Sequence, residues 1–232
     1  MVPKIYLATP AYNSQCCIQF TDTVIQLQKL LLSKDWQFQY QFISGETIIS
    51  FARNLLATDF LNTDSTHLLF LDADMSCNPH DIVRMVEENV DIVGGVYPFK
   101  MLHWDWVEHA VKNGVTANDL ATHSTNYVFT PLENTSRFLD NEDLKEVESV
   151  GTGYMLIKRR VFETMRLHVK TYISEQYGNY GNQYYSFFNI LVKNNISYGE
   201  DNLFCHDWRN LGGKIFVAPY AKAKHYGMHS FG

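Results

Sequence analysis

The chain has 232 residues, of which 46% are hydrophobic and 14% aromatic, and its formal net charge is −6. This apolar content excludes a disordered chain, and the acidic balance disfavours non-specific binding to nucleic acid, which requires a basic face. The sequence has no run of about 20 apolar residues for a transmembrane segment and no polybasic stretch for an anionic membrane. We therefore expect one domain, residues 1–232, with a sizeable core.

The cysteines and the N-terminus bear on the compartment. The first ten residues carry one lysine and a short apolar stretch between prolines, which is typical of a buried strand rather than of a signal peptide. The cysteines form no C-x-x-C pair, which favours reduced thiols over a zinc site or a disulfide framework; they are Cys16, Cys17, Cys77 and Cys205. These features predict a soluble, cytoplasmic protein.

The first half of the chain, residues 1–100, alternates apolar runs with segments of helical periodicity. The last of its helices has Asn78 in the N-cap position and Pro79 at the first helical position. Strands that alternate with helices predict an α/β fold with a mostly parallel central sheet and helices on both faces. Strands are expected at residues 5–10, 38–43, 67–71 and 91–97, and helices at 18–32, 48–61 and 79–88.

The second half, residues 101–232, is less regular. The segment 102–148 shows no clear period, and the aromatic segment 172–189 is typical of a mobile loop lined by rings. Elements are expected as a glycine-broken strand at 147–157, a helix that continues to residue 166, a helix at 201–211 and a final strand at 214–218.

The most specific signal is the sequence LLFLDAD at residues 68–74. A buried strand here delivers Asp72 and Asp74 to its C-terminal end, and ligands of open α/β sheets bind beyond those ends. Two carboxylates so close repel each other unless a cation neutralises them, and Mg²⁺ or Mn²⁺ prefers oxygen ligands and often bridges to phosphates. The simpler interpretation is an Asx turn at a strand end, but the very apolar strand favours a metal site.

Two further signals lie nearer the C-terminus. Glu200 and Asp201 open a predicted helix, where they either complement the helix dipole or include a general base that accepts a proton from a hydroxyl. His225 follows the final predicted strand, and a neutral imidazole suits a Mn²⁺-type ion. Most such histidines are surface residues, and His229 competes for the same role.

In this order and spacing, these residues resemble the GT-A nucleotide-diphospho-sugar glycosyltransferases, in particular the family-2-like group. The resemblance extends from residue 5 to residue 226, and the size is similar to that of small glycosyltransferase domains of large DNA viruses, which act in the host cytoplasm. The matching segments are ATPAYN at 8–13, ARN at 52–54, FLDAD at 70–74, GTG at 151–153, RRVF at 159–162, GED at 199–201, and His225.

The resemblance implies a GT-A (Rossmann-like) fold with a nucleotide-binding half, 1–100, and an irregular acceptor-binding half, 101–232. Asp201 would be the catalytic base, with Glu200 supporting it or holding the acceptor, and residues 151–153 would border the acceptor pocket. The other implied roles are contacts to the nucleotide by Thr9, Pro10, Ala11, Tyr12, Arg53, Asp72 and Ala73, and metal ligation by Asp72, Asp74 and His225.

The implied reaction moves a sugar from a nucleotide-diphosphate donor, most often a UDP-sugar, to a hydroxyl of a glycan or glycoprotein. A divalent cation, Mn²⁺ or Mg²⁺, would offset the charge that develops on the leaving diphosphate. With Asp201 as base, one in-line displacement would invert the anomeric configuration, whereas a retaining enzyme would not need that base. The segment 172–189 would close over the donor, stack on acceptor sugars or pack on the core, and Trp104 and Trp106 would form a sugar platform or belong to the core.

The sequence departs from the family pattern after the second predicted strand. Family members often carry an acidic residue there that holds the nucleobase, so Ser44 or Glu46 would have to take its place.

Two other functions remain open. A sugar nucleotidyltransferase would also use carboxylate-bound Mg²⁺, but it needs a glycine-rich basic loop where this chain has TPAYN at 9–13. A non-catalytic carbohydrate-binding domain of the same fold would not need Asp74, Asp201 and His225 together.

Overall fold

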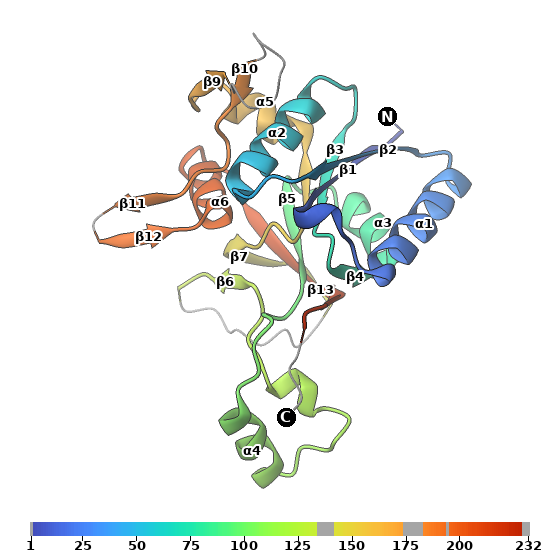
Figure 1. Ribbon diagram of the computed structural model, residues 1–232, viewed down its shortest axis with the longest axis vertical. Coiled ribbons are helices and arrows are strands. Elements are labelled where there is room, and N and C mark those ends of the chain that lie inside the picture. The colour runs from blue at the N-terminus through green and yellow to red at the C-terminus, as the bar shows by residue number, and fades with distance from the viewer. Residues whose placement is uncertain (1, 134–141, 174–182, 194, 229–232) are drawn as a thin grey trace.

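The structure is a computed structural model, and it describes residues 2–133, 142–173, 183–193 and 195–228 (Figure 1). The middle of the aromatic segment predicted at 172–189 and the alternative ligand His229 lie outside these residues. Among the helices of the described ranges, none combines the length and the apolar character that a bilayer crossing requires.

The first half folds largely as predicted, because its apolar runs and helix signals are strong. Asn78 caps its helix as expected: the side-chain oxygen accepts a hydrogen bond from the His80 N–H at 3.1 Å. The elements are β1 (Lys4–Ala11), η1 (Tyr12–Ser14), α1 (Ile18–Ser33), β2 (Gln37–Ser44), α2 (Ile49–Leu61), β3 (His67–Leu71), β4 (Met75–Cys77), α3 (Pro79–Glu87) and β5 (Ile92–Val96).

The second half needs two corrections. The strand predicted at 147–157 is two strands, because the glycine segment 151–153 forms a turn between them. The strand predicted at 214–218 continues to His225, since its later part buries only small alternating side chains and so lacks an apolar run. The elements are α4 (Trp104–Lys112), η2 (Leu120–His123), β6 (Phe129–Pro131), β7 (Lys145–Val150), β8 (Tyr154–Lys158), α5 (Arg159–Met165), β9 (Thr171–Ile173), β10 (Gln183–Tyr185), β11 (Leu191–Lys193), β12 (Ile196–Tyr198), α6 (Glu200–Asn210) and β13 (Ile215–His225).

A nine-stranded sheet runs through the molecule in the order β2-β1-β3-β8-β5-β13-β7-β6, with β4 paired to β13. Strands β2, β1, β3, β5 and β13 point in one direction, whereas β8 is antiparallel to both of its neighbours, β3 and β5. The predicted mostly parallel sheet is therefore confirmed. Because β1 and β3 are parallel, their C-terminal ends meet at one edge of the sheet, where ligands of α/β folds bind.

Helices cover both faces of the sheet, α1 and α3 on one side and α2, α5 and α6 on the other (Figure 1). Within β3, Leu68 and Phe70 pack toward α2, while Leu69 and Leu71 pack toward α1, and all four side chains are fully buried. Burial on both faces explains why this strand is a continuous apolar run rather than an alternating one.

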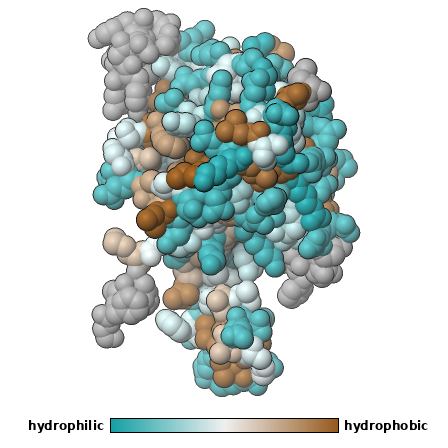
Figure 2. Space-filling view, turned by 90° about the vertical axis from the view of Figure 1, so that its right-hand side faces the viewer, coloured by the Kyte–Doolittle hydropathy of each residue, from teal (hydrophilic) through white to brown (hydrophobic). Residues whose placement is uncertain are grey.

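Residues 98–127 leave the body of the molecule as a projection that we call the arm (Figure 1). Pro98 bridges to Tyr127 at its root, and the His103 N–H donates to the Ser124 carbonyl at 2.8 Å. Helix α4 and η2 form its tip, in a region whose sequence shows no clear period. Several large apolar side chains of the arm are exposed (Figure 2, lower end): Phe99, Met101, Leu102, Trp104, Trp106 and Val111.

Candidate functional site

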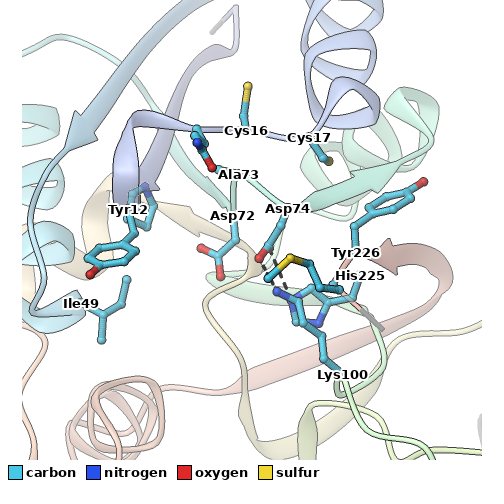
Figure 3. A pocket seen from close by; sticks show the side chains of 14 residues that line it. Tyr12, Cys16, Cys17, Ile49, Asp72, Ala73, Asp74, Lys100, His225 and Tyr226 are labelled. Carbon is cyan, nitrogen blue, oxygen red and sulfur yellow. Dashed lines mark hydrogen bonds and ion pairs between the residues drawn. The ribbon is translucent and has the colours of Figure 1, made fainter. Parts of the chain in front are cut away.

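The candidate site begins at the turn 72–74, directly after β3. The Asp72 N–H donates to the Gly153 carbonyl at 3.0 Å, which ties the turn to the glycine segment before β8. On the other side, the Cys17 N–H at the start of α1 donates to the Ala73 carbonyl at 2.9 Å. These bonds hold the turn at the wall of a pocket of about 620 Å³ (Figure 3).

Asp74 meets two groups that come from distant parts of the chain. Strand β4 pairs with the end of β13, with Met75 opposite His225, so the imidazole Nε2 lies 3.4 Å from Asp74 Oδ1. The ammonium of Lys100, at the root of the arm, contacts Asp74 Oδ2 (Figure 3). Burial acts to raise the pKa of Asp74, but His225 and Lys100 outweigh it and hold the pKa below its usual value.

The ring of His225 is fixed from behind. Its Nδ1 lies 2.9 Å from the Pro98 carbonyl, which can only accept, so Nδ1 carries a proton. In a neutral imidazole, Nε2 then has a lone pair that faces a carboxylate oxygen of Asp74. Two lone-pair donors in this position require a shared cation, either a proton or a metal ion, and an imidazole nitrogen with a carboxylate suits Mn²⁺.

Asp72 faces a buried arginine. Arg53 on α2 is 3% exposed; its Nη2 donates to Asp72 Oδ1 at 3.1 Å, and its Nε lies 3.5 Å from Glu200 Oε1 on α6. Burial acts to lower the pKa of Arg53, but Asp72 and Glu200 outweigh it and raise the pKa, so the guanidinium stays charged. One guanidinium thus joins the end of β3 to the start of α6.

Asp201 follows Glu200 in the first turn of α6. Burial raises the pKa of Asp201, and the neighbouring charge of Glu200 raises it further. The Asn202 N–H donates to Asp201 Oδ1 at 2.7 Å, which fixes the carboxylate. A positioned carboxylate with a raised pKa accepts protons more readily than an ordinary one, as a general base must.

The pocket brings together six of the residues predicted for the site: Pro10, Tyr12, Asp72, Ala73, Asp74 and His225. The other five do not line it: Thr9, Ala11, Arg53, Glu200 and Asp201. Of these, Thr9 is buried, and its hydroxyl donates to the Leu71 carbonyl at 2.8 Å, so it joins β1 to β3. Among the described residues, no group of three or more His, Cys, Asp or Glu side chains is arranged to hold a metal ion.

Sequence reasoning missed several residues of the pocket wall. Gln15, Cys16 and Cys17 follow the predicted nucleotide segment directly, so chain continuity could have indicated them. No local signal marks Lys100, whose role depends on where the arm leaves the sheet. The other missed residues are Ile49, Tyr226, Gly227 and Met228.

Ser44 and Glu46, the two candidates for the acidic residue that holds the nucleobase in the family, do not line the pocket. Glu46 is buried, and its Oε1 accepts a hydrogen bond from the Ile48 N–H at 2.8 Å, so it stabilises the start of α2. Ser44 is exposed at the end of β2. Tyr12 and Ile49 instead flank the end of the pocket away from His225, with the turn 72–74 between (Figure 3).

Two other predicted features have clear positions. The glycine segment lies against Asp72, since a Cβ on Gly153 would lie 3.0 Å from Asp72 Oδ2 and 2.9 Å from the Tyr97 hydroxyl. Trp104 and Trp106 are 65% and 42% exposed on the arm, so they do not belong to the core.

No protein-family model matches the sequence, and no curated protein matches it by sequence. Solved structures, in contrast, are similar in fold. A197 from STIV has a TM-score of 0.53 at 17% sequence identity, over 98% of this chain and 87% of A197. GalNAc-T7, solved with UDP, GalNAc and Mn²⁺, has a TM-score of 0.54 at 10% identity, over 98% of this chain and 45% of GalNAc-T7.

This chain therefore spans less than half of the GalNAc-T7 structure. At these identities the likeness concerns the fold alone. The chain has the GT-A fold of the nucleotide-diphospho-sugar glycosyltransferases.

Proposed function

We propose that this protein is a metal-dependent glycosyltransferase that moves a sugar from a UDP-sugar to a hydroxyl of a glycan or glycoprotein, with inversion. The observation that carries the proposal is the buried guanidinium of Arg53, which contacts Asp72 in the pocket and Glu200 beside Asp201. Arg53 therefore connects the turn 72–74, whose carboxylates suit the donor, with Glu200 and Asp201, which suit the acceptor. Group transfer requires the two substrates to be held side by side in this way.

The pocket wall has room for the parts of a nucleotide diphosphate in order. Tyr12 and Ile49, both exposed at one end, would hold the nucleobase, and Asp72 in the middle would hold the ribose (Figure 3). Thr9, Pro10 and Ala11 would support this end from β1. In other members of the family an acidic residue binds the nucleobase. Because Ser44 and Glu46 are not at the pocket, the exposed ring of Tyr12 would bind the nucleobase here.

Asp74 and His225, with Asp72, would hold a divalent cation. Each carboxylate of the turn already uses one cationic partner, Arg53 for Asp72 and Lys100 for Asp74, so a diphosphate would meet no surplus positive charge without an added cation. When bound, Mn²⁺ or Mg²⁺ acts as a Lewis acid that stabilises the negative charge of the leaving diphosphate.

Asp201 would be the base. As the acceptor oxygen bonds to the anomeric carbon, its proton passes to Asp201, and the bond between the sugar and the β-phosphate breaks with its electron pair on the departing nucleotide diphosphate. Attack from the face opposite the leaving group inverts the anomeric configuration. Burial and then the charge of Glu200 raise the pKa of Asp201 and so strengthen the base, and Arg53 holds Glu200 in place.

We infer a single domain, with residues 1–100 as its nucleotide-binding half and 101–232 as its acceptor-binding half. Most of the pocket wall comes from the first half, whereas α6 and the tip of the arm, α4 with η2, belong to the second. The exposed rings of Trp104 and Trp106 on the arm suit stacking on sugars of an acceptor glycan.

A thermal-shift titration with UDP, GDP, CDP and dTDP, each with and without Mn²⁺, tests the proposal. We expect UDP with Mn²⁺ to give the largest rise in melting temperature, about 5–10 °C at 100 times the Kd, from a gain of about 2.7 kcal/mol. The shift should require the metal ion. No shift with any of the four diphosphates would contradict the proposed function.

A further inference from the structure

Lys100 forms an ion pair with Asp74, the carboxylate that a metal ion would bind. Its ammonium contacts Asp74 Oδ2, whereas His225 Nε2 faces Oδ1 of the same carboxylate (Figure 3). Among the described residues of the pocket wall, it is the one Lys or Arg side chain. The two side chains are 38% and 43% exposed, so the ion pair is open to solvent and can exchange partners.

The stem of Lys100 is held while its charged end remains free to move. Its side-chain carbons pack on Gly227, where a Cβ would lie 3.0 Å from Lys100 Cδ. Two residues earlier, the Pro98 carbonyl accepts the hydrogen bond from His225 Nδ1 at 2.9 Å. The root of the arm is thus attached to the end of β13. Only the terminal atoms of the Lys100 side chain need to move for its ammonium to change partner.

Both carboxylates of the turn already have a cationic partner. Asp72 has the buried Arg53, which cannot leave without stranding charges in the interior. Asp74 has Lys100, which can leave at little cost. A divalent cation that approaches Asp74 must therefore displace the ammonium, and the displaced ammonium stays in the pocket where the phosphates of a donor would lie.

We propose that Lys100 is an exchangeable cation of this site. It pairs with Asp74 while the pocket is empty, and it moves to the phosphates of a nucleotide diphosphate when a divalent cation takes Asp74. The second step rests on the proposed function, whereas the first concerns only Asp74 and the metal ion. Lys100 then weakens metal binding to the empty protein and strengthens nucleotide binding.

Calorimetric titration with MnCl₂ alone tests the first step. Because an exposed ion pair must be broken in the native protein, we expect Lys100→Met to bind Mn²⁺ about two- to fivefold more tightly. Lys100→Arg, which keeps the charge, should bind like the native protein. Lys112→Met is the matched control, since it breaks the exposed pair with Glu108 on the same arm and should change nothing.

Equal or weaker Mn²⁺ binding by Lys100→Met would overturn this step. An absence of Mn²⁺ binding in both the native protein and the variant would overturn it too, because Asp74 would then not be a cation site. Circular dichroism of each variant checks the fold independently of any ligand.

Titration with UDP in the presence of saturating Mn²⁺ tests the second step. Lys100→Met should bind UDP about tenfold more weakly, the loss expected for a charge-assisted hydrogen bond. Unchanged UDP affinity would overturn the move to the phosphates. If the native protein bound no nucleotide even with Mn²⁺, the proposed function and this second step would both fail, while the MnCl₂ titration would still decide the first.

Discussion

The two carboxylates of the turn 72–74 face different regions of the molecule. Asp72 lines the pocket but pairs with the interior, where Arg53 is 3% exposed and joins it to Glu200. Asp74 faces the pocket, where its partners are a flexible lysine and a histidine at the end of β13. Removing one partner from a buried charge network is costly, whereas an exposed ion pair contributes little to stability.

This contrast separates a fixed side of the site from an exchangeable side. The fixed side sets the geometry between the turn and α6 and keeps the acidic pair in place. The exchangeable side offers Asp74 to whichever cation is present. Under the proposed function the site would bind and release a charged donor in every cycle, which needs both properties, because rigid charges position the reaction and mobile ones allow exchange.

The largest effect is expected on the fixed side, from Asp201→Asn. Without the proposed base, release of UDP from the proposed donor in the presence of acceptor should slow by about 10²–10⁴-fold. Asp207→Asn, on the same helix but 44% exposed beside His206, is the matched control and should leave the rate unchanged. A rate for Asp201→Asn within twofold of the native one would show that the base lies elsewhere or that the enzyme retains configuration.

Arg53→Met tests whether the fixed side is a single charge network. The change leaves Asp72 and Glu200 facing each other without a cation, so we expect a loss of about 3 kcal/mol in the free energy of unfolding, measured with urea. Adding Glu200→Gln should recover part of that loss, because one of the two stranded charges is then removed. If Arg53→Met were as stable as the native protein, the buried network would not hold α6 to the turn.

A smaller difference should separate Asp74→Asn from Asp72→Asn in a Mn²⁺ titration. Asp74→Asn removes the exchangeable ligand and should weaken Mn²⁺ binding about tenfold or more, since a unit charge a few ångströms from the cation is lost. Asp72→Asn should weaken it less, because Arg53 already offsets that charge. A larger loss from Asp72→Asn would move the metal ion to the other side of the turn.

The smallest effect concerns pH. The pKa of Asp201 is raised in the folded protein, so folding favours its protonated form, and this contribution to stability is lost as the pH rises through the folded pKa. Asp201→Asn should therefore melt at a higher temperature than the native protein at pH 7, and the gap should close near pH 4. A gap that widened on acidification would contradict the raised pKa.

The strands that position the site could be predicted because buried strands have a distinct pattern of apolar residues. Strand β3 is covered on both faces, so it reads as an apolar run that ends at Asp72. The end of β13 was not predicted from the sequence. Its buried positions are the small residues Ala221 and Ala223, while Lys222 and Lys224 are exposed. The alternation is present, but small side chains make it weak.

The partners of the carboxylates could not be predicted, because they depend on how distant segments pack. The resemblance implied a contact of Arg53 to the nucleotide, and it gave no indication that Arg53 also lies buried between Asp72 and Glu200. A lone arginine amid the apolar face of α2 was the available signal, since a buried guanidinium needs carboxylate partners. Lys100 had no such signal, because only the path of the arm brings it to Asp74.

A crystal structure of the protein with UDP and Mn²⁺ tests the central claim most directly. We expect Mn²⁺ on Asp74 and His225, the ammonium of Lys100 on the phosphates, and Arg53 still between Asp72 and Glu200. Nucleotide bound away from the turn 72–74, or Arg53 withdrawn from Glu200 to contact the diphosphate, would contradict the division into a fixed and an exchangeable side.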